Sequence, residues 1–137
     1  MQHDEFIGQV QSRARLSSRG EAEAATRATL ETLAERVPEA LASKLAAQLP
    51  HEIGEHLRRT VTLEGEGTGM RFGFDEFTHR VAEREGADEP EAVYHSRVVM
   101  QVLDEATQGA LGGKIRDVLP EDLRALIDAG TSGPLGS

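Results

Sequence analysis

Apolar residues recur every three or four positions through residues 1–59, which is the spacing of one face of a helix. This pattern predicts four helices, of which the first is capped by Asp4 and the second is opened by the capping box Ser18-Arg19-Gly20-Glu21. Pro38 begins the third helix, and Pro50 sits in the first turn of a short fourth helix. The predicted inward positions are Phe6, Ile7, Val10, Ala14, Ala22, Thr26, Leu30, Leu33, Val37, Leu41, Leu45, Ile53 and Leu57.

Residues 75–129 repeat the same plan. Asp75 is predicted to cap a helix with Phe77 on its inner face, and the segment Asp88-Glu89-Pro90-Glu91 opens a second long helix. This long helix is apolar nearly all round between Val98 and Leu103. A helix with that pattern is usually buried on several sides, so we expect it at the centre of the molecule.

The two halves align residue by residue. Asp4-Glu5-Phe6 recurs 71 positions later as Asp75-Glu76-Phe77, and the offset becomes 70 after the first turn. We therefore predict an all-α fold of two tandem four-helix repeats, related by a pseudo-two-fold axis and packed into one helical bundle. Arg27 and Arg97 are expected to pair with first-helix carboxylates such as Glu5 and Glu76. The predicted structural anchors are Phe6, Arg27, Leu49, Pro50, Phe77, Arg97, Leu119 and Pro120.

The predicted domain organisation places the first repeat at residues 1–59 and the second at 75–129. Between them, residues 60–74 alternate apolar and polar side chains around several glycines, which suits either a glycine-rich linker or a short β-hairpin. Residues 130–137 contain the run Gly-Pro-Leu-Gly-Ser and are expected to be a disordered tail left by a cloning vector or a protease site.

Composition and charge exclude several classes of function. The chain has no cysteine, which rules out disulfides, thiolate catalysis and cysteine-based metal centres. Its formal net charge of −9 repels phosphate groups, so neither nucleic acid nor an anionic membrane is an expected partner. No stretch approaches the roughly 20 apolar residues of a membrane span. With no recognisable signal peptide, a cytoplasmic location is expected.

The ordered motifs resemble a known family. They are the two Asp-Glu-Phe starts, the segment Val81-Ala82-Glu83-Arg84-Glu85-Gly86, the segment from Pro90 to Arg97, and the two Leu-Pro steps. Together they resemble the bacterial and archaeal domain of unknown function family 2267, over about residues 2–128. The resemblance implies an all-helical, duplicated fold in small cytoplasmic proteins. It carries over no activity, cofactor or catalytic residue.

The segment His51-Glu52-Ile53-Gly54-Glu55-His56 contains the candidate metal ligands His51, Glu52, Glu55 and His56. A helical zinc site needs two histidines four positions apart, whereas these two are five apart. The i,i+4 pairs are His51 with Glu55 and Glu52 with His56, and each supplies only two ligands. The simpler interpretation is an exposed amphipathic helix with two solvated pairs, so no metal site, cofactor or catalytic residue is expected.

Tyr94-His95-Ser96-Arg97 is a polar run inside an otherwise apolar helix. Consecutive helical residues point in different directions, so they form a site only with partners from elsewhere in the fold. A functional interpretation is a small polar pocket that uses Tyr94 or His95. The structural interpretation is that Arg97 and Arg27 make the same contact in each repeat.

Three functions remain open. The leading hypothesis is a non-enzymatic helical interaction module that binds a protein partner or a second copy of itself through a groove or apolar patch between the repeats. The alternative is a small-molecule- or metal-binding protein, or an enzyme, whose site lies between the repeats and uses the histidine segment 51–56 or His95. The third is DNA association through exposed arginines, namely Arg13, Arg15, Arg19, Arg58 and Arg59.

Overall fold

The computed structural model describes residues 1–61 and 72–109, together with positions 121 and 124. These residues form six helices and no strand, which confirms the all-helical class. No helix in the described part of the chain is long and apolar enough to cross a lipid bilayer. The helices are α1 (His3–Arg13), α2 (Arg19–Arg36), α3 (Glu39–Ala47), α4 (His51–Val61), α5 (Phe74–Glu85) and α6 (Glu89–Ala106).

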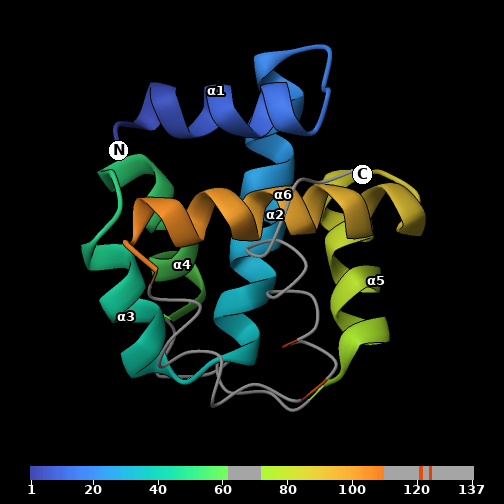
Figure 1. The fold of residues 1–137 in the computed structure, drawn as a ribbon. Coiled ribbons are helices and arrows are strands. Elements are labelled where there is room, and N and C mark those ends of the chain that lie inside the picture. Colours follow the sequence, from blue (N-terminus) through green and yellow to red (C-terminus); the bar gives the residue numbers. More distant parts are fainter. Residues whose placement is uncertain (62–71, 110–120, 122–123, 125–137) are drawn as a thin grey trace.

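Helix α2 runs through the middle of the molecule, with α3 and α4 on one side, α5 on the other, and α1 and α6 lying across it (Figure 1). Its short side chains at Ala22, Ala25, Ala28 and Ala34 have no exposed surface. Side chains this small let neighbouring helices approach on every side. The sequence places α6 at the centre, but among the described residues this position belongs to α2, because α6 packs mainly against α1, α2 and α5.

One continuous apolar core joins the helices. Phe6 of α1 and Phe77 of α5 are its largest side chains, and neither is more than 1% exposed. The apolar run from Val98 to Leu103 contributes five buried residues of α6, so the prediction that this helix is buried on several sides is confirmed. Burial of these aliphatic and aromatic groups is the main stabilising contribution to the fold.

The observed starts of the long helices α2 and α6 agree with the sequence-based prediction, whereas those of the shorter helices α1 and α5 differ from it. Ser18 and Asp88 cap α2 and α6, since their side chains accept hydrogen bonds from the backbone N–H groups of Glu21 and Glu91. The predicted cap at Asp4 is wrong, because α1 begins at His3 and its N-cap is Gln2. Asp4 lies in the first turn instead, where its carboxylate pairs with Arg19 and suits the positive end of the helix.

The cap predicted at Asp75 is wrong in the same way. Helix α5 begins at Phe74 and its N-cap is Gly73, which leaves Asp75 and Glu76 in the first turn. The backbone carbonyl of Gly73 accepts the first helical hydrogen bond, from Phe77, at 2.9 Å. The apolar residue Phe74 packs against the core from this first turn, which extends the helix by one residue before Asp75.

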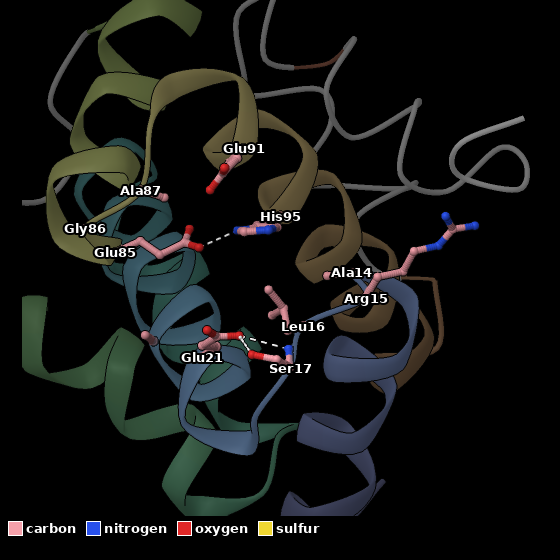
Figure 2. Close-up of a pocket in the computed structure, with 11 residues that line it drawn as sticks. Ala14, Arg15, Leu16, Ser17, Glu21, Glu85, Gly86, Ala87, Glu91 and His95 are labelled. Atoms are coloured by element: carbon pink, nitrogen blue, oxygen red, sulfur yellow. Dashed lines mark hydrogen bonds and ion pairs between the residues drawn. The ribbon is translucent and has the colours of Figure 1, made fainter.

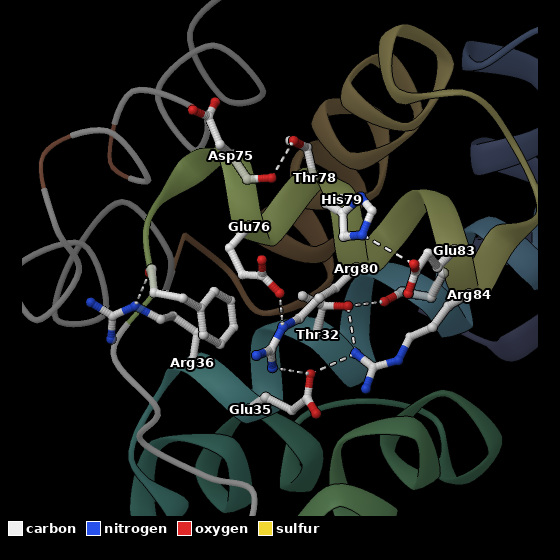
Figure 3. Close-up of polar contacts among 12 residues, drawn as sticks. Thr32, Glu35, Arg36, Asp75, Glu76, Thr78, His79, Arg80, Glu83 and Arg84 are labelled. Carbon is white, nitrogen blue, oxygen red and sulfur yellow. Dashed lines mark hydrogen bonds and ion pairs between the residues drawn. The ribbon is translucent and has the colours of Figure 1, made fainter.

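A polar network ties α2 to α5 (Figure 3). One guanidinium nitrogen of Arg84 donates to Oγ1 of Thr32 and to Oε1 of Glu35, at 2.7 Å in each case. Arg80 donates to the same carboxylate oxygen at 3.2 Å. Burial raises the pKa of Glu35, but the hydrogen bonds and charges of the two arginines outweigh it and lower the pKa below its ordinary value. This carboxylate is therefore ionised and paired at the α2–α5 interface.

The segment between the halves is described only at its ends. Helix α4 continues through Val61, so the first two positions of the predicted linker are helical, and Phe74 already belongs to α5. The linker or hairpin prediction for residues 62–71 lies outside the described residues, as do the third and fourth helices predicted for the second half, apart from positions 121 and 124, and the tail 130–137.

Candidate ligand-binding site

A buried ion pair joins the end of α5 to the middle of α6. Nδ1 of His95 lies in hydrogen-bond contact with Oε2 of Glu85, and the side chains are only 9% and 7% exposed. The hydrogen bond to Glu85 raises the pKa of His95 above its ordinary value, against burial, which lowers it. The negative charges of Glu91 and Glu21 add to this increase. The imidazole is thus favoured in its protonated form, which donates Nδ1–H to the carboxylate.

The local sequence folds these two residues together. Gly86 ends α5 in the left-handed conformation, with φ of 77°, which glycine adopts without steric strain. Its N–H donates to the carbonyl of Ala82 at 2.9 Å. Asp88 then caps α6 after one further residue. Because the turn is this short, α6 folds back on α5 and side chains ten positions apart meet.

The ion pair faces a cavity of about 420 Å³ between two turns of the chain. The turn from α1 to α2 forms one wall and the turn from α5 to α6 forms another, with the first part of α6 beside them (Figure 2). On the first wall, the backbone N–H and the hydroxyl of Ser17 both donate to Oε2 of Glu21 at 2.9 Å. The lining residues are Ala14, Arg15, Leu16, Ser17, Glu21, Ala24, Glu85, Gly86, Ala87, Glu91 and His95.

The cavity is acidic. The hydrogen bonds from Ser17 lower the pKa of Glu21, which therefore carries its charge at neutral pH. Figure 2 shows the carboxylates of Glu85 and Glu91 directed toward one another, while the side chain of Arg15 points away from the cavity. Oε1 of Glu85 is buried and has no hydrogen-bond partner among the described residues. A buried acceptor without a donor destabilises the fold, and this oxygen has almost no surface accessible from the cavity.

Tyr94, His95 and Ser96, the first three residues of the polar run on α6, lie in three different environments. Tyr94 points toward α1, where its hydroxyl donates to the carbonyl of Arg13 at 2.8 Å. Ser96 is fully buried and its hydroxyl has no partner among the described residues. Only His95 lines the cavity. The pocket suggested for Tyr94 or His95 therefore belongs to His95, and its partners come from other helices.

The candidate metal ligands of α4 lie in two places. His51 and Glu55 form an ion pair at 3.5 Å, and the side chain of His51 is 76% exposed. Glu52 and His56 line a second cavity, of about 540 Å³, together with residues of α1 and α2. Within residues 1–61 and 72–109, no three His, Asp or Glu side chains are placed to hold a metal ion. The helix therefore separates the four residues into two pairs.

His56 has a cationic environment. Burial, together with the charges of Arg59 and Arg27, lowers its pKa to about 4. The guanidinium of Arg59 also lies in hydrogen-bond contact with Nδ1 of His56. A positive charge at this nitrogen repels a metal cation and occupies a position that the metal would need.

The apolar anchors lie in the core or next to it. Phe6, Leu49 and Phe77 are buried. Pro50 immediately precedes α4, and its carbonyl accepts a hydrogen bond from the N–H of Ile53 at 3.0 Å. The second Leu-Pro step, Leu119 and Pro120, lies outside the described residues.

The two repeated arginines have different surroundings. Arg27 is exposed at the edge of the second cavity. Arg97 is half-buried, and its Nε is buried without a hydrogen-bond partner in the described part of the chain. Glu76, a predicted partner of these arginines, instead accepts a hydrogen bond from Nε of Arg80 at 2.7 Å. The i,i+4 spacing of Glu76 and Arg80 on α5 explains this choice, because such residues share one helix face.

Sequence reasoning missed the carboxylates of the cavity. The sequence does place these three carboxylates at the ends of predicted helices. Glu85 precedes a glycine, and Glu21 and Glu91 each follow a capping residue by three positions. These positions identify turns, and turns are places where side chains from two helices converge. The residues around each turn, however, do not indicate that the two turns face one another in the fold.

The fold and the cavity define an all-helical protein with an acidic cavity and a buried histidine–carboxylate pair. A family of uncharacterized conserved proteins, DUF2267, matches residues 3–126, and the chain belongs to this family. A search of curated proteins finds no match.

Proposed function

We propose that this protein is a small-ligand-binding module and that its site is the acidic cavity between the α1–α2 and α5–α6 turns. The observation that carries the proposal is the Glu85–His95 pair, a buried ion pair whose two residues both line the cavity. The cavity volume of about 420 Å³ falls within the range of small-molecule sites. The alternative function considered from the sequence, with a site between the repeats, is thus the one we favour.

Energetic reasoning supports a role for this pair beyond stability. Transferring a histidine and a carboxylate out of water is costly, and an apolar pair of similar volume often stabilises a protein equally well. A titratable group whose pKa is shifted by a specific charged partner inside a cavity is a candidate functional group. His95 meets this description, since Glu85 raises its pKa and both residues line the cavity.

We also propose that the chain is a tandem duplication and that the cavity lies between equivalent turns. At the sequence offset of 71, Arg15 corresponds to Gly86, and both have positive φ values, of 56° and 77°. At the offset of 70, Glu21 corresponds to Glu91, and both line the cavity. A cavity formed by the same turn of each repeat is a natural place for a site in a duplicated fold.

We favour binding over catalysis and over protein interaction. The described residues place no activated nucleophile beside His95, since the hydroxyl of Ser17 donates to Glu21. An interaction module acting through an apolar patch needs exposed anchors, and Met1 is the only large apolar side chain exposed in the described part of the chain. Nucleic-acid binding has little support, because Arg13 and Arg19 are paired with Glu105 and Asp4.

A fragment screen by NMR tests the proposed function. A library of cationic, neutral and anionic fragments is added to the ¹⁵N-labelled protein, and amide shifts are followed. We expect hits that move the amides of Gly86, Ala87 and His95 together. Glu85→Gln should abolish these shifts, whereas Glu83→Gln, the same substitution at an exposed position of α5, should preserve them. A screen without hits at this cavity would overturn the proposal.

A further inference from the structure

We propose that the ligand of this cavity is a small neutral molecule with a carbonyl group, whose oxygen accepts a hydrogen bond from Nε2–H of His95. This inference rests on the ligand-binding function proposed above and goes further by naming the chemistry of the ligand. The observation that carries it is a buried histidine of the cavity lining that uses one ring nitrogen in the fold and leaves the other without a partner among the described residues.

The two ring nitrogens of His95 differ in their surroundings. Nδ1 contacts the carboxylate of Glu85, whereas Nε2 makes no hydrogen bond to any described residue. Nε2 is not sealed inside the protein, since the buried polar atoms without a partner include Oε1 of Glu85 and Oγ of Ser96 but not this nitrogen. The side chain of His95 is only 9% exposed and lines the cavity, so a molecule held there can reach Nε2.

The pairing with Glu85 makes Nε2 a hydrogen-bond donor. An ionised carboxylate only accepts hydrogen bonds, so Nδ1 carries a proton in this contact. The hydrogen bond to Glu85 raises the pKa of His95 above its ordinary value, which favours the imidazolium. An imidazolium donates from both nitrogens, and a bond from a charged donor to a carbonyl oxygen is stronger than one between two neutral groups.

A second histidine beside the same turn has both of its nitrogens paired. Nδ1 of His79 on α5 lies 3.1 Å from Oε1 of Glu89, again ten positions away. Nε2 of His79 lies 3.0 Å from Oε1 of Glu83, and the side chain is 50% exposed. The protein thus supplies two carboxylates to the exposed histidine of this helix pair, whereas it leaves one nitrogen of the buried histidine available to a ligand.

The charge of the cavity favours a neutral acceptor over an anion. A carboxylate ligand would also accept from Nε2–H, but the lining already carries Glu21, Glu85 and Glu91 against one imidazolium. Arg15 is the other cationic residue of the lining, and its side chain points away from the cavity (Figure 2). In a partly enclosed cavity, fixed charges are screened less than in bulk water, so this excess of negative charge repels an anion.

The size and lining of the cavity favour an organic ligand over a metal ion. The cavity of about 420 Å³ accommodates several non-hydrogen atoms, and Ala14, Leu16 and Ala87 give part of its wall an apolar character suited to a hydrocarbon group. A metal ion would also bind a free histidine nitrogen, but the described residues contain no group of three His, Asp or Glu side chains able to hold one.

Three probes of similar size and different charge test the inference, namely benzamide, benzoate and benzylammonium. Each is titrated at pH 6 and constant ionic strength into the ¹⁵N-labelled protein, and dissociation constants are taken from the amide shifts of Gly86 and Ala87. The ring nitrogen signals of the histidines are followed in the same samples. We expect benzamide to bind most tightly and to shift the Nε2 signal of His95, with no shift at His79.

The pH dependence of benzamide binding identifies the donor. Benzamide does not titrate between pH 6 and pH 9, and glutamate carboxylates ordinarily titrate at about pH 4.3. The charged groups that line the cavity with His95 are Glu85 of α5, Glu91 of α6, Glu21 of α2 and Arg15 of the α1–α2 turn. The dissociation constant should rise roughly tenfold as the pH passes through the pKa of His95, because deprotonation turns Nε2 from a donor into an acceptor.

Substitution of His95 gives a second test. His95→Leu should abolish benzamide binding, whereas the matched control His79→Leu should change the dissociation constant less than about twofold. If His95→Leu fails to fold because Glu85 is left as a buried, unpaired charge, the double variant with Glu85→Gln removes that charge and takes its place. The pH series on the wild-type protein needs no variant.

The possible outcomes separate this inference from the proposed function. Tighter binding of benzoate or benzylammonium than of benzamide, or benzamide binding that ignores pH and leaves the Nε2 signal of His95 unmoved, would overturn the carbonyl ligand and leave the binding function standing. If no probe binds while the fragment screen yields hits at the cavity, the inference fails alone. If the screen also yields none, both proposals fail.

Discussion

Arg13 of α1 and Glu105 of α6 form a two-pronged ion pair across 92 positions of sequence, with Nη1 to Oε2 at 2.7 Å and Nη2 to Oε1 at 2.9 Å. The hydrogen bonds raise the pKa of Arg13 and lower that of Glu105, so both side chains are charged over the working pH range. The pair connects the first helix of the chain to the last helix that the structure describes.

Removal of this pair should weaken the fold modestly. Arg13→Gln and Glu105→Gln should each lower the free energy of unfolding by about 0.5–1 kcal/mol, because the pair is partly exposed but has good bidentate geometry. Urea denaturation of both single variants and the double variant checks this. A double-mutant cycle isolates the pair from the separate contact between Arg13 and Gln9. Strictly additive single effects would show that the pair contributes nothing.

The contribution of His95 to stability should decline as the pH rises. Its folded pKa is raised above 6.5 by the hydrogen bond to Glu85 and by the charges of Glu91 and Glu21. The stabilisation is therefore fully present below pH 6.5 and is lost as the pH rises through the folded pKa. Unfolding free energies of wild type and His95→Gln, measured between pH 5 and pH 9, should converge on the alkaline side. A difference that grows with pH would contradict this linkage.

His56 should have the opposite pH dependence. Its pKa is lowered from 6.5 to about 4 in the folded state, so the unfolded chain binds the proton first as the pH falls. Stability should therefore be lost between pH 6.5 and about pH 4, and His56→Asn should remove this part of the loss. His51→Asn, on the exposed face of the same helix, serves as the matched control. Identical acid profiles for wild type and His56→Asn would exclude the effect.

Two helical glycines should respond to alanine with opposite signs. A Cβ at Gly8 of α1 would meet no atom within 4 Å, whereas a Cβ at Gly54 of α4 would lie 2.9 Å from the carbonyl oxygen of Ala46. Gly8→Ala should raise the free energy of unfolding by about 0.5–1 kcal/mol, because alanine loses less backbone entropy in a helix. Gly54→Ala should lower it by about 1 kcal/mol or more, because α3 and α4 must separate. Thermal denaturation of both variants measures the contrast.

Local features of the fold follow directly from the sequence. Neighbouring residues are enough to predict the caps at Ser18 and Asp88, the burial of Phe6 and Phe77, and the apolar stretch of α6. The reason is that helix periodicity and capping depend on residues within one or two helical turns. The errors at Asp4 and Asp75 are also local, since acidic residues are favoured both at the cap and in the first turn of a helix.

The cavity could be predicted only in part. The sequence singles out His95 as a polar residue on an apolar helix, and the i,i+4 rule separates the histidines of α4 into two pairs. It does not identify Glu85 as the partner of His95, because this contact depends on the angle at which the turn around Gly86 returns α6 toward α5.

Among the described residues, the amino-acid order by itself indicated the helical segments, the starts of the two long helices, and the side chains that avoid water. Tertiary structure alone decided that α2 is the central helix and that the turns carrying Ser17 and Gly86 face one another. The physical reason is that a hydrophobic stripe on a helix indicates which face of that helix is buried but not which other helix covers it. Packing selects the covering helix from many compatible apolar surfaces. Ion pairs between residues distant in sequence, such as Arg13 and Glu105, form only after packing has brought their helices together.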